Sequence, residues 1–401
     1  MLPYITYIQI YVSVFSSILL TFYPGLFTYK SFALVMAFIG ALVIFVELCK
    51  QRRRIYQIGL VSAIGLFIVF LYLITEIKYP KVDERYYSYL LVLVGQVLPV
   101  IICSSIIAHK EDVQYQIKCL SLPIAIIFGL IAFYSGFFPT SETSGGYVAN
   151  ENNLNYQSTS YLAAYSAGLS LYYLYCSNNI HWDFFLSESF LSKIMKGMLF
   201  VNFLTILIAG GRGALVLFVI EICFYLYILY KSKRISMKNA LRVCAYFVIS
   251  MVVILIGIYF AANSHIKTSG FDRILKTIYE GHQSGREVFR EIAYIKFIDS
   301  PIIGHGIGSV FNEVGMYTHN FLLDSLVEAG IIGAFIYSLF IFISVRKGWS
   351  LFKSDNTNCL WLIIFLHGFG MSLFSGYYLA QLPLFWAGTF MLCKDLKNNH
   401  V

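Results

Sequence analysis

Residues 320–345, NFLLDSLVEAGIIGAFIYSLFIFISV, decide the fold of this chain. The stretch can cross a membrane as a helix, because about 20 mostly apolar residues span ~30 Å of hydrocarbon. It carries two carboxylates near its start, Asp324 and Glu328. A carboxylate inside a span is costly unless it faces protein or water, so a function is expected at this end of the predicted helix.

The composition of the whole chain agrees with this first stretch. Of its 401 residues, 58% are hydrophobic and 12% are charged, and a soluble protein carries about twice that charged fraction. The sequence therefore predicts an all-α, polytopic integral membrane protein with about twelve transmembrane helices. The predicted spans are 4–22, 31–49, 55–75, 89–108, 119–138, 158–177, 197–211, 213–230, 241–262, 320–345, 359–376 and 379–393.

The positions of Lys and Arg predict the orientation of these spans. With the N-terminus inside, 18 of the 29 Lys and Arg residues lie in cytoplasmic segments, as the positive-inside rule requires. Both termini are then cytoplasmic, and the basic clusters QRRR (51–54) and KSKR (231–234) orient the membrane protein. The same distribution weighs against nucleic acid as a partner.

Three segments are expected to form one membrane domain. Residues 1–262 hold the first nine predicted spans, 263–319 form a large outer loop, and 320–401 hold the last three spans. Hydrophilic residues concentrate in the long outer loop, and the two halves show no repeat, which weighs against a transporter built from matching halves.

The outer loop is expected to contain an amphipathic helix over residues 285–299. Ser284 and Glu287 form a capping box at its start, and Pro301 ends it. Arg286 and Arg290 are four residues apart and share one face. Apolar residues recur at helical spacing and predict a helix on or near the membrane surface: Val288, Phe289, Ile292 and Ile295.

Three arginines predict a site for an anion on the outer side. Arg212 lies between two predicted spans and is flanked by Gly211 and Gly213, where a helix N-terminus also favours negative charge. Arg286 and Arg290 add guanidinium groups, which bind phosphate bidentately. The alternatives are a snorkelling arginine in a short hairpin and pairing of the loop arginines with nearby glutamates or lipid headgroups. Together the three favour a diphosphate-binding cluster.

A candidate for proton transfer stands where the tenth predicted span begins. His319 carries an imidazole, whose reference pKa near ~6.5 suits proton transfer at neutral pH, and Asn320 follows it. The alternative is an interfacial histidine that contacts headgroups. Glu328 is a competing base, and one of the arginines is its expected partner. No metal-ligand motif is visible, so neither a metal nor another cofactor is predicted.

Three segments in order resemble the O-antigen polymerase and ligase superfamily of bacterial envelopes. They are GGRGALV (210–216), GREVFREIAYIKFIDSPIIGHGIGSVF (285–311) and HNFLLDSLVEAGIIG (319–333). Arg290 stands where the family often has Trp, so either loop arginine can be the principal one. The matching positions are Arg212, Arg286, Pro301, Gly304, Gly306, His319, Asn320, Glu328 and Gly330.

The resemblance implies a GT-C-like glycosyltransferase in the bacterial cytoplasmic (inner) membrane, with its active site facing the periplasm. It implies glycosyl transfer from undecaprenyl-diphosphate-linked donors without a metal. Among the activities of this superfamily we favour a polymerase that joins lipid-linked oligosaccharide repeats, because it is the more frequent activity among such diverse, aromatic-rich sequences. The implied catalytic residues are His319, Arg212, Arg286 and Glu328. The implied substrate-binding residues are Arg212, Arg286, Arg290, Asn320, Gly211 and Gly213.

The implied partners are the lipid-linked donor and acceptor, the lipid bilayer and, as a further candidate, a chain-length regulator protein. Two other functions stay open. A ligase would transfer finished glycan to lipid A-core, and a flippase would move the lipid-linked sugar across the membrane.

Overall fold

The computed structural model describes residues 6–8, 58–78, 90, 92–137, 156–177, 179–180, 187–239, 241–242, 245, 286–314 and 317–394. Its regular elements are helices, with no strand in these ranges. The all-α prediction is therefore confirmed for this part of the chain. The chain forms two compact units, divided within α7 (Glu111–Phe137) after Leu120, and each is described by itself.

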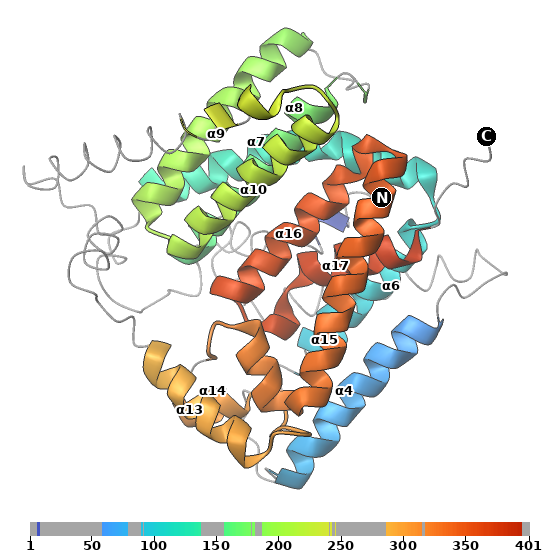
Figure 1. The fold of residues 1–401 in the computed structure, drawn as a ribbon, viewed down its shortest axis with the longest axis vertical. Coiled ribbons are helices and arrows are strands. Elements are labelled where there is room, and N and C mark those ends of the chain that lie inside the picture. Colours follow the sequence, from blue (N-terminus) through green and yellow to red (C-terminus); the bar gives the residue numbers. More distant parts are fainter. Residues whose placement is uncertain are drawn as a thin grey trace, which may run out of the picture. The chain divides into compact units, whose positions relative to one another are not determined.

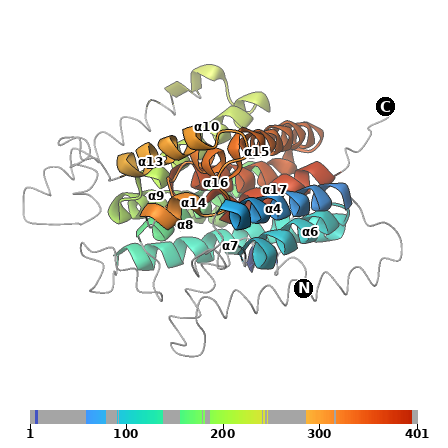
Figure 2. The same cartoon turned by 90° about the horizontal axis from the view of Figure 1, so that it is seen from below.

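The first unit contains most of the described helices (Figure 1). In addition to the start of α7 it holds α4 (Ile58–Lys78), η1 (Leu93–Val97), α6 (Leu98–Ile107), α13 (Arg286–Asp299), α14 (Ser309–Val314), α15 (Phe321–Ser354), η2 (Asn356–Asn358), α16 (Cys359–Phe374), η3 (Tyr378–Ala380) and α17 (Leu382–Cys393). Helix α17 packs against α6, α15 and α16, and Figure 2 shows α15, α16 and α17 grouped together. Almost all of α17 is buried, so it is the core helix of this unit.

The second unit holds the rest of α7 with α8 (Tyr156–Cys176), α9 (Glu188–Ala209) and α10 (Arg212–Lys231). Helix α8 is its core and packs against α9 and α10. A buried polar chain joins three helices, because the Ser166 hydroxyl donates to the Ala125 carbonyl at 2.7 Å and accepts from the Asn202 amide at 2.9 Å. Tyrosine and serine are frequent in this largely buried helix, and the hydroxyls of Ser160, Ser166 and Ser170 donate to backbone carbonyls.

Five of the described helices are long and apolar enough to cross a membrane. They are Glu111–Phe137, Glu188–Ala209, Arg212–Lys231, Phe321–Ser354 and the stretch Asn356–Phe374. Each of the five corresponds to a predicted span. The shorter apolar helices Leu93–Ile107 and Leu382–Cys393 lie within two further predicted spans, 89–108 and 379–393. The chain is a multi-pass membrane protein. The total of about twelve spans stays a prediction.

Several predicted spans cannot be compared in the same way. Helices α4 and α8 overlap the predicted spans 55–75 and 158–177 but are not among the five. The predicted spans 4–22, 31–49 and 241–262 lie outside the described residues, apart from short pieces.

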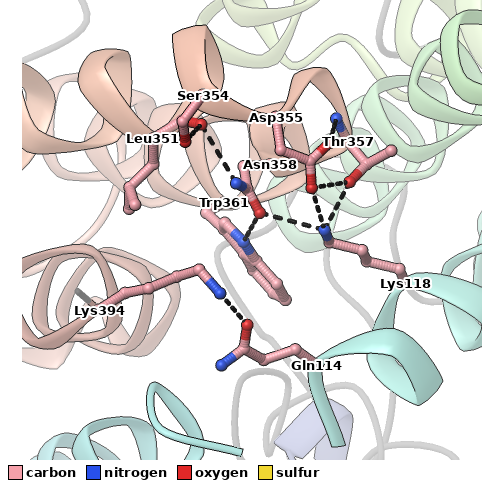
Figure 3. Close-up of polar contacts among 9 residues, drawn as sticks. All are labelled: Gln114, Lys118, Leu351, Ser354, Asp355, Thr357, Asn358, Trp361 and Lys394. Atoms are coloured by element: carbon pink, nitrogen blue, oxygen red, sulfur yellow. Dashed lines mark hydrogen bonds and ion pairs between the residues drawn. The ribbon is translucent and has the colours of Figure 1, made fainter. Parts of the chain in front are cut away.

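A polar cluster around the buried Lys118 joins four parts of the first unit near the end of α15 (Figure 3). The Lys118 ammonium donates to the Thr357 hydroxyl at 2.6 Å and to the Asn358 side-chain oxygen at 3.1 Å, and it lies 3.4 Å from the Asp355 carboxylate. Lys394 donates to the Gln114 side chain. Because these residues come from the first turns of α7, from η2 and from the residues that follow α15 and α17, the cluster connects the start of α7 to the ends of α15 and α17.

Helix α15 is interrupted at Gly330, where the backbone has φ 64° and ψ −166°. The sequence predicts one continuous span here, whereas the structure has a short segment before the break and a long one after it. The long segment, from Ile331 to Ser354, is roughly 36 Å of helix at about 1.5 Å per residue. It is therefore long enough by itself to cross the hydrocarbon, and the short segment, with Asp324 and Glu328, precedes it.

Candidate active site around His319

Helix α13 confirms the predicted helix over residues 285–299 almost to the residue. It packs on α14 and on the short segment of α15 through a small core of Ala293, Val310, Val327, Phe297 and Leu323. The predicted apolar face is only partly the packed one. Val288 and Ile295 are exposed, whereas Ala293 is fully buried against α14 and α15.

The turn after Pro301 is hydrogen-bonded to the break in α15. His305 N–H donates to the Val327 carbonyl at 2.8 Å, Gly306 N–H to the Glu328 carbonyl at 2.8 Å, and Ile331 N–H to the Pro301 carbonyl at 2.8 Å. These bonds satisfy carbonyls and amides that the broken helix cannot pair internally. The break in α15 therefore exposes backbone groups that form hydrogen bonds with the turn.

Close backbone approach explains glycine at two of these positions. Gly304 has φ 73°, and a Cβ added there would lie 2.6 Å from the Ala329 nitrogen. A Cβ on Gly330 would lie 2.6 Å from the Ile303 nitrogen and closer still to the Ile302 carbonyl. Only a residue without Cβ fits either place.

Glu328 connects the turn to the segment between α16 and α17. One carboxylate oxygen accepts from Gly308 N–H at 2.7 Å, and the other accepts from the Tyr377 hydroxyl at 2.6 Å. The sequence predicts an arginine as partner, but the observed partners are a backbone amide and a tyrosine. Each oxygen of Glu328 thus accepts one hydrogen bond, and the choice between His319 and Glu328 as the base stays a prediction.

His319 is buried and held in an unusual conformation. Its backbone has φ 58°, in the left-handed region that residues other than glycine rarely adopt. Its Nδ1 lies 2.8 Å from the Ser375 carbonyl oxygen, and the Tyr317 ring packs edge-on at 4.5 Å between ring centroids. A carbonyl only accepts, so in the neutral ring the proton is on Nδ1 and the lone pair is on Nε2.

Asn320 has a clear structural task in addition to its predicted role at the substrate. Its side-chain oxygen accepts from Leu322 N–H at 3.1 Å and from Leu323 N–H at 3.2 Å. It is therefore the N-cap of α15. The predicted contact between Asn320 and substrate stays a prediction.

The predicted arginines lie on two different units. Arg286 and Arg290 belong to α13, and Arg290 is exposed. Since α13 packs on the short segment of α15, both arginines are on the helix next to the one that follows His319. Arg212 is exposed and is the first residue of α10 in the second unit, so its meeting with the loop arginines stays a prediction.

The turn before α10 has the shape that the sequence predicts. Helix α9 ends at Gly210, which has φ 78°, and Gly211 is the N-cap of α10. Gly211 N–H donates to the Ser160 hydroxyl at 3.2 Å, and a Cβ at this glycine would collide with Ser160. The turn therefore packs tightly on α8 and leaves Arg212 at a helix N-terminus, with Gly213 next in the helix.

The His305 side chain connects the turn after Pro301 to helix α13. Its Nε2 lies 2.8 Å from the Lys296 carbonyl oxygen. Burial lowers the pKa of His305, and the bond to Lys296 opposes this only in part. Thr75 of α4 reinforces the same turn, because its hydroxyl accepts from Ile307 N–H at 2.9 Å.

Three contributors to the site were not predicted from the sequence. Ser375 and Tyr377 belong to SGYYLAQLP (375–383), which reads as a short link between two spans. A cluster of Tyr, Gln, Gly and Pro there could have indicated ordered backbone in place of a plain link. Thr75 lies in an apolar helix, and only its polar hydroxyl could have indicated a contact with another segment.

Within the described ranges, no group of three or more His, Cys, Asp or Glu side chains is placed to hold a metal ion. Metal-independent chemistry stays a prediction from the resemblance. The groups that the structure brings together at this site are an imidazole, two carboxylates, tyrosine hydroxyls and backbone amides.

Comparison with known proteins finds one family. A family model described as O-antigen ligase matches residues 197–338, which run from α9 into α15 and include Arg212, Arg286 and His319. No curated protein and no solved structure matches the chain. The match covers 142 of the 401 residues, and it supports the resemblance of this part of the chain to the O-antigen ligase and polymerase superfamily.

Proposed function

We propose that this protein is a polysaccharide polymerase that joins undecaprenyl-diphosphate-linked oligosaccharide repeats. The observation that carries the proposal is the orientation of His319, whose Nδ1 lies 2.8 Å from the Ser375 carbonyl. The proposal includes a GT-C-like fold of about twelve spans, an inner-membrane location, cytoplasmic termini and a site that faces the periplasm. Five helices able to span a membrane support it.

In the proposed reaction, a hydroxyl of the acceptor sugar attacks the anomeric carbon of the donor. The new carbon–oxygen bond forms while the bond to diphosphate breaks, and its electron pair leaves with the diphosphate oxygen. The acceptor's proton goes to Nε2 of His319. A base so placed contributes typically ~10²–10⁴-fold to the rate, and the hydrogen bond at Nδ1 keeps the correct tautomer.

Guanidinium groups are proposed to stabilise the leaving diphosphate. Arg286 and Arg290 come from the helix that packs on the start of α15, and Arg212 comes from the N-terminus of α10. Arginine suits this task because its planar fork binds phosphate oxygens bidentately. The cations then replace a metal at the developing negative charge.

A ligase that transfers glycan to lipid A-core is the second candidate, and the description of the matching family as O-antigen ligase favours it. Both candidates use the same donor and leaving group, so the acceptor distinguishes them. Purified protein in nanodiscs is incubated with a lipid-linked repeat alone, and the products are separated by size. A ladder without lipid A-core supports the polymerase, and joining only after core is added assigns the ligase.

A flippase for the same lipids is the remaining alternative. It predicts lipid transfer between leaflets without any new glycosidic bond. If Arg212→Ala and Arg286→Ala block flipping but leave glycan joining intact, the proposed role of these arginines is wrong.

A further inference from the structure

Asp324 has no role in the chemistry above, yet it is the carboxylate nearest in sequence to His319. Its side chain is 1% exposed. One oxygen, Oδ1, accepts from Thr318 N–H at 2.9 Å and from the Thr318 hydroxyl at 2.7 Å. Side chains in the first turns of a helix lean toward its N-terminus, which explains why Asp324 reaches back over the start of α15.

The Thr318 hydroxyl continues this contact across His319. It accepts from Asn320 N–H at 3.2 Å while it donates to Asp324. Thr318 and Asn320 are the residues on either side of His319, so the two bonds close a small loop around it. Thr318 is fully buried, and water does not offer an alternative partner.

This loop accounts for the conformation of His319. A residue other than glycine in the left-handed region is strained, and such conformations persist only where surrounding structure holds them. His319 has φ 58°, and in that conformation its Nδ1 reaches the Ser375 carbonyl at 2.8 Å. Without the loop, the backbone is free to relax and the ring to leave that carbonyl.

The helix start does not need Asp324 for its own sake. Asn320 already caps α15 with two hydrogen bonds. Moreover, the second oxygen of Asp324, Oδ2, is buried without a hydrogen-bond partner among the described residues, which is costly for a polar atom. The hydrogen bonds that Asp324 does accept both come from Thr318, the residue before His319.

We propose that Asp324 is a positioning residue, which holds His319 through Thr318 in the conformation that directs Nε2 at the acceptor hydroxyl. The inference rests on the proposed glycosyl transfer. It assigns Asp324 an effect on the chemical step and none on substrate binding.

Four variants test this role in two matched pairs. Asp324→Ala removes both hydrogen bonds, whereas Asp324→Asn keeps an oxygen at Oδ1. Thr318→Val removes the hydroxyl at nearly the same volume, whereas Thr318→Ser keeps it. Each protein is purified in nanodiscs, its folding is checked by thermal unfolding, and kcat and KM are measured for glycosyl transfer from a lipid-linked repeat.

Asp324→Ala and Thr318→Val are expected to lower kcat by roughly 10²-fold, the typical cost of a misplaced catalytic group, with KM unchanged. Asp324→Asn and Thr318→Ser are expected to keep most of the wild-type kcat. If Asp324→Ala does not fold, the Thr318 pair decides, because it leaves the buried carboxylate in place.

Three results would overturn the inference: wild-type kcat in Thr318→Val, a change in KM alone, or an equal loss in Asp324→Asn and Asp324→Ala. Failure of the proposed function looks different. In that case the wild-type protein itself forms no glycosidic bond, or His319→Ala retains full activity.

Discussion

Replacing Gly330 by alanine probes the break in α15 that organises the site. The backbone there has φ 64° and ψ −166°, a conformation close to the region that is essentially restricted to glycine and costs other residues about 1–3 kcal/mol. The new Cβ would lie 2.6 Å from the Ile303 nitrogen. The turn after Pro301 must therefore move away from α15.

That movement breaks backbone hydrogen bonds as well. The new Cβ would lie closest to the Ile302 carbonyl, which accepts from Ile332 N–H at 3.5 Å, and the preceding Pro301 carbonyl accepts from Ile331 N–H at 2.8 Å. Losing one or two such bonds costs about 1 kcal/mol each. Together with the backbone strain, the expected loss is about 2–5 kcal/mol. Against a typical stability of about 5–15 kcal/mol, this is a large fraction.

The assay is unfolding of the purified protein in mixed detergent with increasing SDS, followed by tryptophan fluorescence. Gly65→Ala is the matched control, because Gly65 lies inside α4 with no heavy atom within 4 Å of an added Cβ. It is expected to be neutral or stabilising by up to ~1 kcal/mol. If Gly330→Ala lies within about 0.5 kcal/mol of wild type, the account of the break is wrong.

Three further predictions concern His305, Lys118 and Arg286. Because burial lowers the pKa of His305 in the folded state, its contribution to stability is fully present above ~6.5 and is lost as the pH falls below that value. His305→Asn should flatten the pH dependence of the melting temperature between pH 7 and 5, and an unchanged slope would contradict this. Lys118→Met should cost about 1–3 kcal/mol, mainly through the hydrogen bonds, since the Asp355 partner is half exposed and contributes little. SDS unfolding measures this, with the exposed Lys353→Met as control, and equal stability of the two variants would refute it. Arg286→Lys should retain charge yet lose much of the glycosyl transfer rate, because lysine cannot bind bidentately; full activity in the kinetic assay would exclude a guanidinium role.

Local signals explain what the sequence predicted well. Helix α13 begins and ends near the predicted positions because Pro301 stops it and its apolar residues have helical spacing. The glycines around Arg212 correctly indicated a tight turn between two helices. Each of these signals depends on residues within a few positions of one another.

Long-range contacts explain what the sequence could not supply. Gly330 lies in an apolar run and reads as an ordinary helical glycine, and only the approach of Ile302 reveals the break. The bond between His319 and the Ser375 carbonyl joins residues 56 positions apart. It ends on a backbone atom that every residue has, so no side-chain pattern could indicate it. The pairing of Tyr377 with Glu328 was missed because these two residues are 49 positions apart in the sequence.

The most direct test of the account is the release of undecaprenyl diphosphate during glycan joining. Purified wild-type protein in nanodiscs should release one diphosphate for each glycosidic bond formed. His319→Ala should lower the rates of diphosphate release and of glycan joining together by roughly 10²–10⁴-fold. Its thermal unfolding should remain cooperative. Full release by His319→Ala, or lipid flipping by the wild type with neither release nor joining, would contradict the account.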